Sequence, residues 1–362
     1  MVRESLEAIL LVGGKGTRLR PLTLSAPKPL LPTAGVPFLA HQLTRAAASG
    51  ITHVVLATSY RAEMFTEAFG DGAALGLSID YVYESTPLGT GGGIRNAAEL
   101  LRGGPDDPIV VLNGDILSGH DLTAQVGLHR DKDAAVTLHL TEVEDPSRYG
   151  CVPTDPAGRV TAFLEKMPNP VTNKINAGCY IFRRSVIGQI PAGRPVSVEH
   201  ETFPQLIEAD AVIMGYDEPG AYWLDVGTPE AFVRGSCDVV LGHMPSPAMP
   251  GACGEALLLP GASAAPGSSV TGGTVLGSGS CVGAGADVHG SVVFDAAEIG
   301  AGAVVRDSIV GRGAVIADGA VLAGVVIGDE AYIGPGNELR SGARVWPKVR
   351  LEQTSVRFSA DG

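Results

Sequence analysis

The last third of the chain carries an apolar residue at every sixth position over four successive triplets. The triplets are Leu276, Val282 and Val288; Val293, Ile299 and Val305; Val310, Ile316 and Leu322; and Ile327, Ile333 and Leu339. Their leading residues recur every 17 positions, and Leu259 extends that series towards the N-terminus. This period is typical of a parallel β-helix, in which three short strands form each triangular coil. We therefore predict a β-helix over residues 256–345, with these side chains inside.

Glycines follow directly after several of these apolar residues, and we predict that they turn the corners of the coils. They are Gly277, Gly283, Gly300, Gly311, Gly328 and Gly334. A coil of 17 rather than 18 residues requires one corner that is shorter by a residue. Because stacked repeats have open ends and flat faces, we expect a homo-oligomer that assembles through this domain.

The first two-thirds of the chain alternate strand-like and helix-like segments, which predicts an α/β domain with a mostly parallel, Rossmann-like sheet. The expected strands are 8–12, 53–58, 77–83, 109–112, 134–140, 160–164 and 177–182, and the expected helices are 38–48, 62–69 and 92–101. Three prolines near residue 247 indicate a linker. We predict a catalytic domain over 1–242, a linker over 243–255, the β-helix over 256–345 and a tail over 346–362.

A glycine-rich turn follows the first expected strand and carries Gly13, Gly14, Lys15, Gly16, Thr17 and Arg18. Successive free backbone amides in such a turn form an anion-binding nest, and Arg18 and Lys28 add positive charge. The spacing differs from that of a P-loop. It also differs from the dinucleotide fingerprint, because Leu19 stands where the third glycine belongs. These features suit a triphosphate.

The signature is longer than this turn: Gly-Gly-x-Gly-Thr-Arg-Leu-x-Pro-Leu-Thr over residues 13–23, then Pro27-Lys28-Pro29. It resembles the signature of the sugar-1-phosphate nucleotidyltransferases. In this chain we expect the catalytic domain to be followed by a left-handed β-helix. The resemblance implies that Arg18 and Lys28 are catalytic. Arg18 would stabilise charge on the transferring phosphoryl group and the pyrophosphate, and Lys28 would help to hold the triphosphate or the α-phosphate. The implied nucleotide contacts are Leu11, Gly13, Gly14, Gly16, Thr17, Arg18, Lys28, Glu84, Pro87, Gly89, Thr90, Asn113 and Gly114.

Two aspartates are candidate ligands for Mg²⁺, a hard cation that prefers oxygen donors. Asp115 ends an expected strand, and Asp225 lies in the segment Trp223-Leu-Asp-Val-Gly227. A turn-forming role for Asp115 and a helix-terminal role for Asp225, before Pro229, are the structural alternatives. Both segments resemble the metal-binding positions of the family, which also makes Asp115 a catalytic candidate.

The stretch from Glu84 to Gly93 resembles the nucleoside loop of the family, in which Gly89 and Thr90 would lie against the base. Guanine presents two adjacent donors that one carboxylate can accept, whereas uracil and thymine present a single donor flanked by acceptors. Glu84 therefore favours GTP. The alternative is that Glu84 is solvated and that backbone groups bind the base.

Three stretches resemble the sugar-phosphate site of the family. They are Tyr149-Gly150, the pair Glu165-Lys166, and Asn176-Ala177-Gly178. By this resemblance the Glu165 carboxylate binds sugar hydroxyls, Lys166 binds the sugar phosphate, and Asn176 and Gly178 contact the sugar ring. Met167 replaces the proline that usually follows the Glu-Lys pair.

The segment Val198-Glu-His-Glu-Thr-Phe-Pro-Gln-Leu206 resembles the mannose-1-phosphate guanylyltransferase branch, which implies GTP and mannose 1-phosphate as substrates. One alternative is a transferase for glucose 1-phosphate or a heptose 1-phosphate with UTP, dTTP, CTP or ATP. A second is a non-catalytic regulatory subunit, although such a protein is expected to lose Arg18, Lys28 or a metal aspartate. A third is acyl transfer in the β-helix, where His289 is the only histidine.

The formal net charge of −13 argues against nonspecific binding to nucleic acid or to anionic membranes. The five cysteines lack a Cys-x-x-Cys pair, which favours free thiols over a disulfide framework or a zinc site. The apolar run near the N-terminus is too short for a signal peptide or a membrane span. We therefore expect a cytoplasmic protein.

Overall fold

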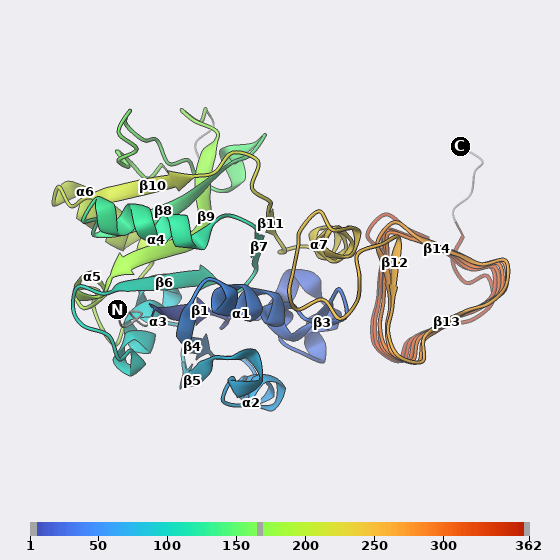
Figure 1. Cartoon of the computed structure of the whole chain (residues 1–362). Helices are drawn as coiled ribbons and strands as arrows, with labels where there is room; N and C mark the ends of the chain where they lie inside the picture. Colours follow the sequence, from blue (N-terminus) through green and yellow to red (C-terminus); the bar gives the residue numbers. More distant parts are fainter. Residues whose placement is uncertain (1–5, 165–168, 358–362) are drawn as a thin grey trace. The chain divides into compact units, whose positions relative to one another are not determined.

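The computed structural model describes residues 6–164 and 169–357 (Figure 1). The chain divides into two compact units, which are described separately. The first contains the chain up to Gly14 together with Gln42–Trp223, and the second contains Lys15–His41 together with the chain from Leu224 onwards. The glycine-rich signature is therefore shared: its first two glycines belong to the first unit and the rest to the second.

A seven-stranded sheet in the order β10-β8-β9-β6-β1-β4-β5 forms the centre of the first unit (Figure 1). The strands are β1 (Leu6–Leu11), β4 (Ile51–Thr58), β5 (Ser78–Tyr83), β6 (Pro108–Asn113), β8 (Val136–Glu142), β9 (Lys174–Arg183) and β10 (Ile213–Asp217). Only β9 runs antiparallel to its neighbours β6 and β8. The predicted mostly parallel α/β sheet is confirmed.

The helices follow the predicted alternation with small differences at their ends. They are α1 (Phe38–Ala48), α2 (Ala62–Phe69), α3 (Gly89–Ala97), α4 (Leu122–Asp131), α5 (Arg184–Ile187) and α6 (Phe203–Glu208). The first two have the predicted bounds. Helix α3 begins three residues earlier than predicted and ends in a 3₁₀ turn, η5 (Ala98–Leu100). The earlier start brings the glycine-rich end of the nucleoside loop into the first turn of α3.

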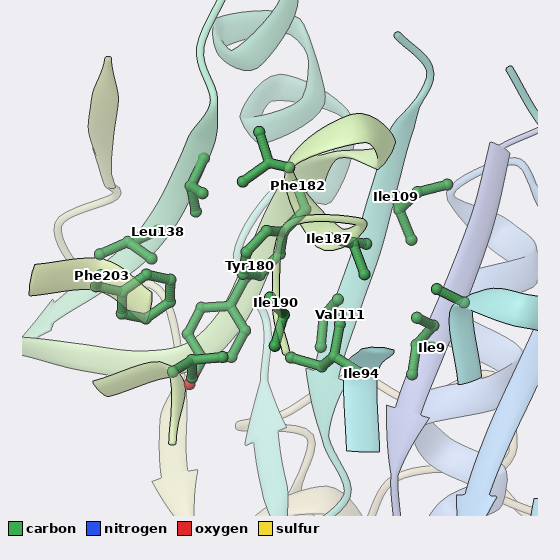
Figure 2. Packing of buried hydrophobic residues seen from close by; sticks show 14 of the residues in the cluster. Ile9, Ile94, Ile109, Val111, Leu138, Tyr180, Phe182, Ile187, Ile190 and Phe203 are labelled. Atoms are coloured by element: carbon green, nitrogen blue, oxygen red, sulfur yellow. The ribbon is translucent and has the colours of Figure 1, made fainter. Parts of the chain in front are cut away.

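The main core of the first unit lies between the sheet and α3 (Figure 2). Ile9 of β1 and Val111 of β6 face Ile94 of α3, and all three side chains are fully buried. Tyr180 on β9 and Phe203 on α6 extend this core, with ring centroids 5.4 Å apart. Alternate side chains of each strand point to the opposite face of the sheet. On that face α4 packs against β6, β8, β9 and β10.

The strand predicted over residues 160–164 is absent as a regular element, so that prediction was wrong. Val160 and Leu164 form only isolated bridges, to Thr154 and Cys151 respectively. The intervening turn is closed locally, because one Asp155 carboxylate oxygen accepts hydrogen bonds from two backbone amides of the same turn. Isolated bridges around this turn take the place of the regular hydrogen-bond ladder that a strand would form.

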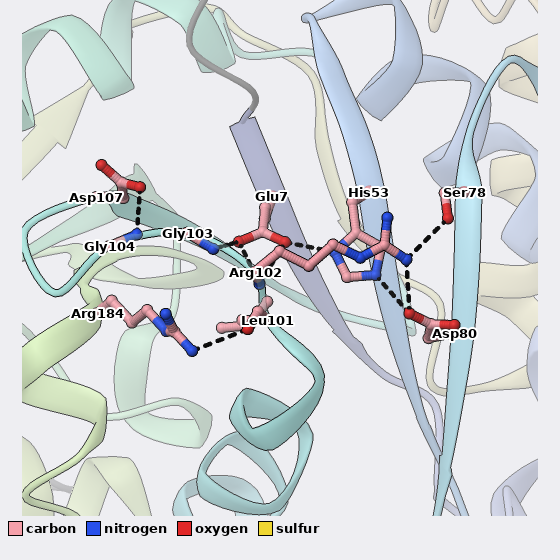
Figure 3. Close-up of polar contacts among 10 residues, drawn as sticks. All are labelled: Glu7, His53, Ser78, Asp80, Leu101, Arg102, Gly103, Gly104, Asp107 and Arg184. Carbon is pink, nitrogen blue, oxygen red and sulfur yellow. Dashed lines mark hydrogen bonds and ion pairs between the residues drawn. The ribbon is translucent and has the colours of Figure 1, made fainter.

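A polar cluster closes the amino ends of β1, β4 and β5 (Figure 3). His53 lies between two carboxylates, with Nδ1 2.5 Å from Glu7 and Nε2 2.9 Å from Asp80. The backbone amides of Arg102 and Gly103 also donate to Glu7. Burial raises the pKa of Glu7, but His53 and these amides outweigh burial and hold that pKa below its ordinary value. The cluster lies at the end of the sheet opposite to the glycine-rich turn.

The second unit contains the predicted parallel β-helix, built from three sheets of short strands (Figure 1). One wall is β12 (Ala256–Leu258), β15 (Thr274–Leu276), β18 (Val292–Val293), β21 (Ile309–Val310), β24 (Val326–Ile327) and β27 (Arg344–Val345). The second is β13 (Ser263–Ala264), β16 (Cys281–Val282), β19 (Glu298–Ile299), β22 (Val315–Ile316), β25 (Tyr332–Ile333) and β28 (Arg350–Leu351). The third is β14 (Ser269–Thr271), β17 (Asp287–His289), β20 (Val304–Arg306), β23 (Val321–Ala323) and β26 (Glu338–Arg340).

All twelve apolar residues of the four predicted triplets are buried in one interior cluster. The predicted extension to Leu259 was wrong by one residue, because Leu258 rather than Leu259 pairs with Leu276. The first coil therefore has 18 residues, as does the last, in which Val326 pairs with Arg344. Coils of 17 residues lie between them, which is consistent with a left-handed β-helix whose corners differ by one residue.

The glycines that directly follow the apolar residues are required by the close stacking of neighbouring coils, and not by the turn of the chain at a corner. A Cβ at Gly277 would lie 2.5 Å from the backbone nitrogen of Asp295 in the next coil, and one at Gly311 would lie 2.6 Å from that of Asp329. The left-handed backbone conformation occurs two residues later, at Gly279 and Gly313, for example. The prediction that Gly277 and its equivalents turn the corners is corrected accordingly: they permit close contact between coils.

Helix α7 (Pro229–Leu241) packs on the first wall of the β-helix within the same unit. Thr228 caps its N-terminus by accepting a hydrogen bond from the Ala231 amide. Gly273 allows the contact, because a Cβ there would lie 2.6 Å from the Cys237 carbonyl oxygen. Across the part of the chain that the structure describes, no helix is long and apolar enough to cross a membrane.

Candidate active site

The signature loop of the second unit is folded tightly around Gly16. This residue has φ +58°, and a Cβ there would lie 3.0 Å from side-chain carbons of both Thr23 and Lys28. The Thr23 hydroxyl donates to the Gly16 carbonyl over 2.9 Å, which ties two turns of the loop together. Leu19 and Leu22 are buried, so the loop is anchored by its apolar residues. Its polar residues Lys15, Thr17 and Arg18 remain exposed.

Arg18 and Asp225 both lie close to Gly227 in the second unit. Arg18 Nη2 and Asp225 Oδ1 each lie 3.0 Å from the point that a Gly227 Cβ would occupy. Asp225 is the last residue of β11 (Trp223–Asp225), and the chain then turns into α7. The structure therefore places a guanidinium and a carboxylate, both predicted from the sequence, next to the same glycine. Gly227 was not a sequence-predicted site residue, although it belongs to the segment that identified Asp225.

In the first unit, Asp115 follows β6 on a two-residue turn that precedes β7 (Ile116–Ser118). Gly114 fits this turn against the end of β1, because its amide donates to the Leu11 carbonyl and a Cβ would lie 2.5 Å from that oxygen. Gly178 of β9 lies close by, since a Cβ there would be 2.8 Å from Asn113 Nδ2. The sheet thus brings predicted nucleotide and sugar residues of β6 and β9 together.

Gly13 and Gly14 end the first-unit part of the signature. The Ser59 hydroxyl donates to the Gly13 carbonyl, and a Gly13 Cβ would lie 2.9 Å from Ser59 Oγ. Gly14 has open space around its Cα, so a side chain there would meet no described neighbour within 4 Å. The end of β1 is therefore closed on the Ser59 side and open at Gly14.

The nucleoside loop is shaped by contact with the chain at Val196. Gly91 donates its amide to the Val196 carbonyl over 2.8 Å, and the Val196 amide donates to the Leu88 carbonyl over 2.9 Å. A Cβ at Gly89 would lie 2.6 Å from the Val196 carbonyl oxygen. Gly89 was predicted to lie against the base. In the structure, the close approach of the protein backbone requires a glycine here. Pro87, also a predicted contact, is exposed in this loop.

Glu84 is half-buried at the start of the same loop. Its Oε2 accepts a hydrogen bond from the Leu88 amide at 3.3 Å, and its Oε1 would lie 2.7 Å from a Cβ at Gly93. Burial raises the pKa of Glu84, and the Leu88 amide opposes that rise. One carboxylate oxygen therefore supports the loop, while the other lies against the first turns of α3.

Glu199 joins the nucleoside loop to β9. Its Oε2 accepts hydrogen bonds from the hydroxyls of Thr90 at 2.9 Å and Ser197 at 2.8 Å, and its Oε1 accepts from the Tyr180 hydroxyl at 3.3 Å. Asn176 Nδ2 donates to the same Tyr180 oxygen over 2.9 Å. Burial and the Glu199 charge raise the pKa of Tyr180 well above its ordinary value, so the phenol stays protonated as a donor.

Sequence reasoning singled out the segment that contains Glu199 but assigned no role to it. The available signal was the resemblance of residues 198–206 to one branch of the family, which does not reveal a partner more than a hundred residues away. Only the tertiary fold brings Thr90 and Tyr180 to this carboxylate.

Of the predicted sugar residues, the structure describes Tyr149, Gly150, Asn176 and Gly178. Tyr149 is exposed to 38% and packs edge-on against Trp223, with ring centroids 5.7 Å apart. Trp223 Nε1 donates to the Ala177 carbonyl over 2.9 Å, which brings this aromatic pair to the Asn176–Gly178 stretch. Gly150, with φ +77°, follows Tyr149 in the left-handed conformation. Glu165 and Lys166 lie outside the described residues.

The chemistry of the donors fits a hard divalent cation. Asp115 and Asp225 offer carboxylate oxygens, and no cluster of three or more His, Cys, Asp or Glu side chains suited to a metal occurs within 6–164 and 169–357. Asp115 belongs to the first unit and Asp225 to the second, and each offers the kind of oxygen ligand that Mg²⁺ prefers. Softer metals would instead need nitrogen or sulfur ligands.

Comparison with known families is decisive for the class of protein. Residues 7–240 match the Nucleotidyl transferase family, and residues 252–357 match the GMPPB C-terminal domain. The chain belongs to the nucleotidyl transferase family. Members of this family generally use a divalent metal. The sequence-based assignment to sugar-1-phosphate nucleotidyltransferases is thereby confirmed at the level of family and fold.

Relatives and solved structures resemble this nucleotidyltransferase over different shares of its length. A mannose-1-phosphate guanylyltransferase of Mycobacterium tuberculosis is 55% identical over 362 residues, covering 100% of both chains. The mannose-1-phosphate guanylyltransferase catalytic subunit beta of Drosophila pseudoobscura pseudoobscura is 40% identical and covers 72% of this chain and 71% of its own. HddC from Yersinia pseudotuberculosis, solved in complex with GMP-PN, is 28% identical with a TM-score of 0.54, covering 64% of this chain and 98% of its own.

Proposed function

We propose that this nucleotidyltransferase transfers a guanylyl group from GTP to mannose 1-phosphate and releases GDP-mannose and pyrophosphate. The observation that carries the proposal is the 55% identity to the mycobacterial mannose-1-phosphate guanylyltransferase over the full length of both chains. Two further relatives, from a fly and from a fungus, carry closely similar names. The proposal also agrees with the carboxylate of Glu84 in the nucleoside loop.

The transfer needs little proton chemistry, because an oxygen of the sugar phosphate is already anionic. That oxygen attacks the α-phosphorus of GTP, a new P–O bond forms, and the bond between the α-phosphorus and the bridging oxygen breaks. Both bonding electrons leave with pyrophosphate. Positioning and electrostatic stabilisation therefore account for most of the rate enhancement.

Arg18 is proposed to stabilise the negative charge that develops on the transferring group and the leaving pyrophosphate. Lys28 is proposed to hold the triphosphate, and Lys166 the phosphate of the sugar. Asp115 and Asp225 would hold Mg²⁺, which when bound neutralises phosphate charge. Glu165 and Asn176 are proposed to bind the sugar, with Tyr149, Gly150 and Gly178 shaping that site.

The test is pyrophosphate release in the presence of Mg²⁺. Five nucleotides, GTP, ATP, UTP, CTP and dTTP, are each combined with mannose 1-phosphate, glucose 1-phosphate and a heptose 1-phosphate. We expect release with GTP and mannose 1-phosphate to exceed every other pair. Preference for UTP or dTTP would overturn the guanine assignment, and preference for another sugar would overturn the mannose assignment.

The proposed metal ligand is tested by Asp225→Asn, which keeps the size of the side chain and removes its charge. We expect loss of activity together with loss of the Mg²⁺ dependence of GTP binding, measured by titration of GTP with and without Mg²⁺. The matched control is Asp238→Asn, in α7, whose carboxylate pairs with Arg234 and His243. An active Asp225→Asn enzyme that responds normally to Mg²⁺ would remove this residue from the metal site.

We also propose that the protein assembles into a homo-oligomer through its β-helix and acts in the cytoplasm, where GTP is available. Light scattering coupled to size-exclusion chromatography tests the first point, and a monomeric mass at micromolar concentration would contradict it.

A further inference from the structure

The β-helix wall that contains β12 and β27 contacts the signature segment, residues 15–41, at both ends of the wall. Near β27, Arg344 Nη1 donates a hydrogen bond of 2.8 Å to the carbonyl oxygen of Arg20. Near β12, Gly35 packs so closely that a Cβ there would lie 2.9 Å from Leu259 and 3.2 Å from Leu257. These contacts all lie within the second unit.

The two contacts are separated by the full length of the wall. Six strands give five inter-strand steps, and each step is about 4.8 Å, so the anchors lie roughly 24 Å apart along the wall. At the β12 end, α7 adds a further contact, because the Ala34 amide donates to the Ser236 hydroxyl over 2.9 Å. The signature segment is thus fixed at Arg20 by the last coil and at residues 34–35 by the first coil and α7.

We propose that Arg344 is a positioning residue for the nucleotide-binding loop, so that the β-helix serves catalysis as well as assembly. Arg344 acts through the Arg20 carbonyl, two residues after Arg18, and Arg18 lies beside Asp225 at Gly227. Without this hydrogen bond, the backbone at Arg20 is held by the turns of the loop and by the buried Leu19 and Leu22. We therefore expect the Arg18 guanidinium to be positioned less precisely. This inference rests on the proposed function for its kinetic consequence.

The contact is one charge-assisted hydrogen bond from a cationic side chain to a backbone carbonyl. A single N–H of the guanidinium donates to a backbone carbonyl, so a lysine ammonium at the same position can make the same bond. An alanine cannot. The Lys variant therefore separates the loss of this hydrogen bond from other effects of changing an exposed side chain.

The first experiment is independent of activity. Hydrogen–deuterium exchange of the full-length protein is followed by mass spectrometry for peptides that cover residues 15–31 in wild type, Arg344→Ala, Arg344→Lys and Arg312→Ala. Arg312 is the matched control, since it is an exposed arginine of the same β-helix that pairs with Asp295 at 3.5 Å. We expect several-fold faster exchange around Arg20 in Arg344→Ala alone, and no change in the melting temperature. Wild-type exchange in that variant would overturn the proposal.

The second experiment separates this inference from the proposed function. Wild-type enzyme is first assayed with GTP and mannose 1-phosphate, and absence of turnover counts against the proposed function only. If turnover is present, we expect Arg344→Ala to lower kcat about 10-fold with less than a 3-fold change in the KM for GTP, and Arg344→Lys to restore most of kcat. Unchanged kcat in Arg344→Ala, or a loss that Arg344→Lys does not recover, would overturn the positioning role.

Discussion

The hydroxyl of Thr90 donates a hydrogen bond of 2.9 Å to the carboxylate of Glu199, a residue 109 positions further along the chain. Thr90 lies in the first turn of α3, in the nucleoside loop, whereas Glu199 also accepts a hydrogen bond from Tyr180 on β9, the strand of the predicted sugar contacts. One carboxylate therefore connects the two predicted substrate regions of the first unit. The Val198 amide reinforces the connection by donating to the Thr90 hydroxyl over 3.0 Å.

Replacement Glu199→Gln should weaken this connection, because a neutral amide accepts hydrogen bonds less strongly than a carboxylate. We expect kcat/KM to fall by roughly 10- to 100-fold, corresponding to one or two charge-assisted hydrogen bonds. Steady-state kinetics with each substrate varied in turn measures this. The matched control is Glu201→Gln, whose carboxylate instead pairs with Arg194 at 2.9 Å. Equal losses in the two variants would contradict the role of Glu199.

Replacement Gly16→Ala tests the packing of the signature loop. The residue has φ +58°, and its new methyl group would press on Thr23 and Lys28 at 3.0 Å. We expect a loss of about 2 kcal/mol in the free energy of unfolding, from backbone strain and overpacking together. Urea denaturation of Gly16→Ala and Gly14→Ala gives the comparison, because Gly14 has open space around it. A larger loss at Gly14 would show that the loop is not anchored at Gly16.

Replacement Arg18→Ala tests the proposed role in charge stabilisation. Groups that stabilise charge mainly in the transition state lower kcat when they are removed, commonly by about 10²- to 10³-fold. We expect such a decrease with a much smaller change in GTP affinity, measured by isothermal titration calorimetry. Arg61→Ala provides the control, since Arg61 lies at the start of α2 and stacks on Tyr60. Unchanged turnover in Arg18→Ala would eliminate the proposed role.

The stability of the protein should fall as the pH drops below about 6.5. Burial lowers the pKa of His120 to about 2 and that of His139 to about 3, and their rings stack with centroids 3.7 Å apart. Burial also lowers the pKa of His129 to about 4. The unfolded chain thus binds protons that the folded chain does not, and each such histidine costs about 1.4 kcal/mol of stability per pH unit between its two pKa values.

Chemical denaturation from pH 7 to pH 4.5 measures this dependence. His139→Phe keeps a flat ring against His120 and removes one of the titrating groups. It should therefore reduce the slope without abolishing it, since burial also lowers the pKa of His41 and the remaining histidines keep their contributions. A slope identical to that of the wild type would show that His139 is not held neutral in the folded protein.

The periodic elements of this protein follow from its sequence. The six-residue period specifies the interior of the β-helix, since only the inward positions must be apolar, and all twelve predicted residues are buried. The alternation of apolar strands with amphipathic helices likewise specifies the α/β sheet. Contiguous motifs such as residues 13–23 are sufficient to identify the family, because their glycines and charged residues stand at fixed spacing.

Relations between distant segments required the tertiary structure. The sequence offers no sign that Glu199 binds Thr90, that Gly89 is required by the backbone at Val196, or that Arg344 reaches Arg20. It also misplaced the first coil by one residue at Leu259, since the length of a corner depends on packing at the end of the stack. Local pattern determines which elements form, because propensity and burial act through near neighbours. Which side chains meet is decided by the packing of whole elements, and their contacts depend on no local pattern.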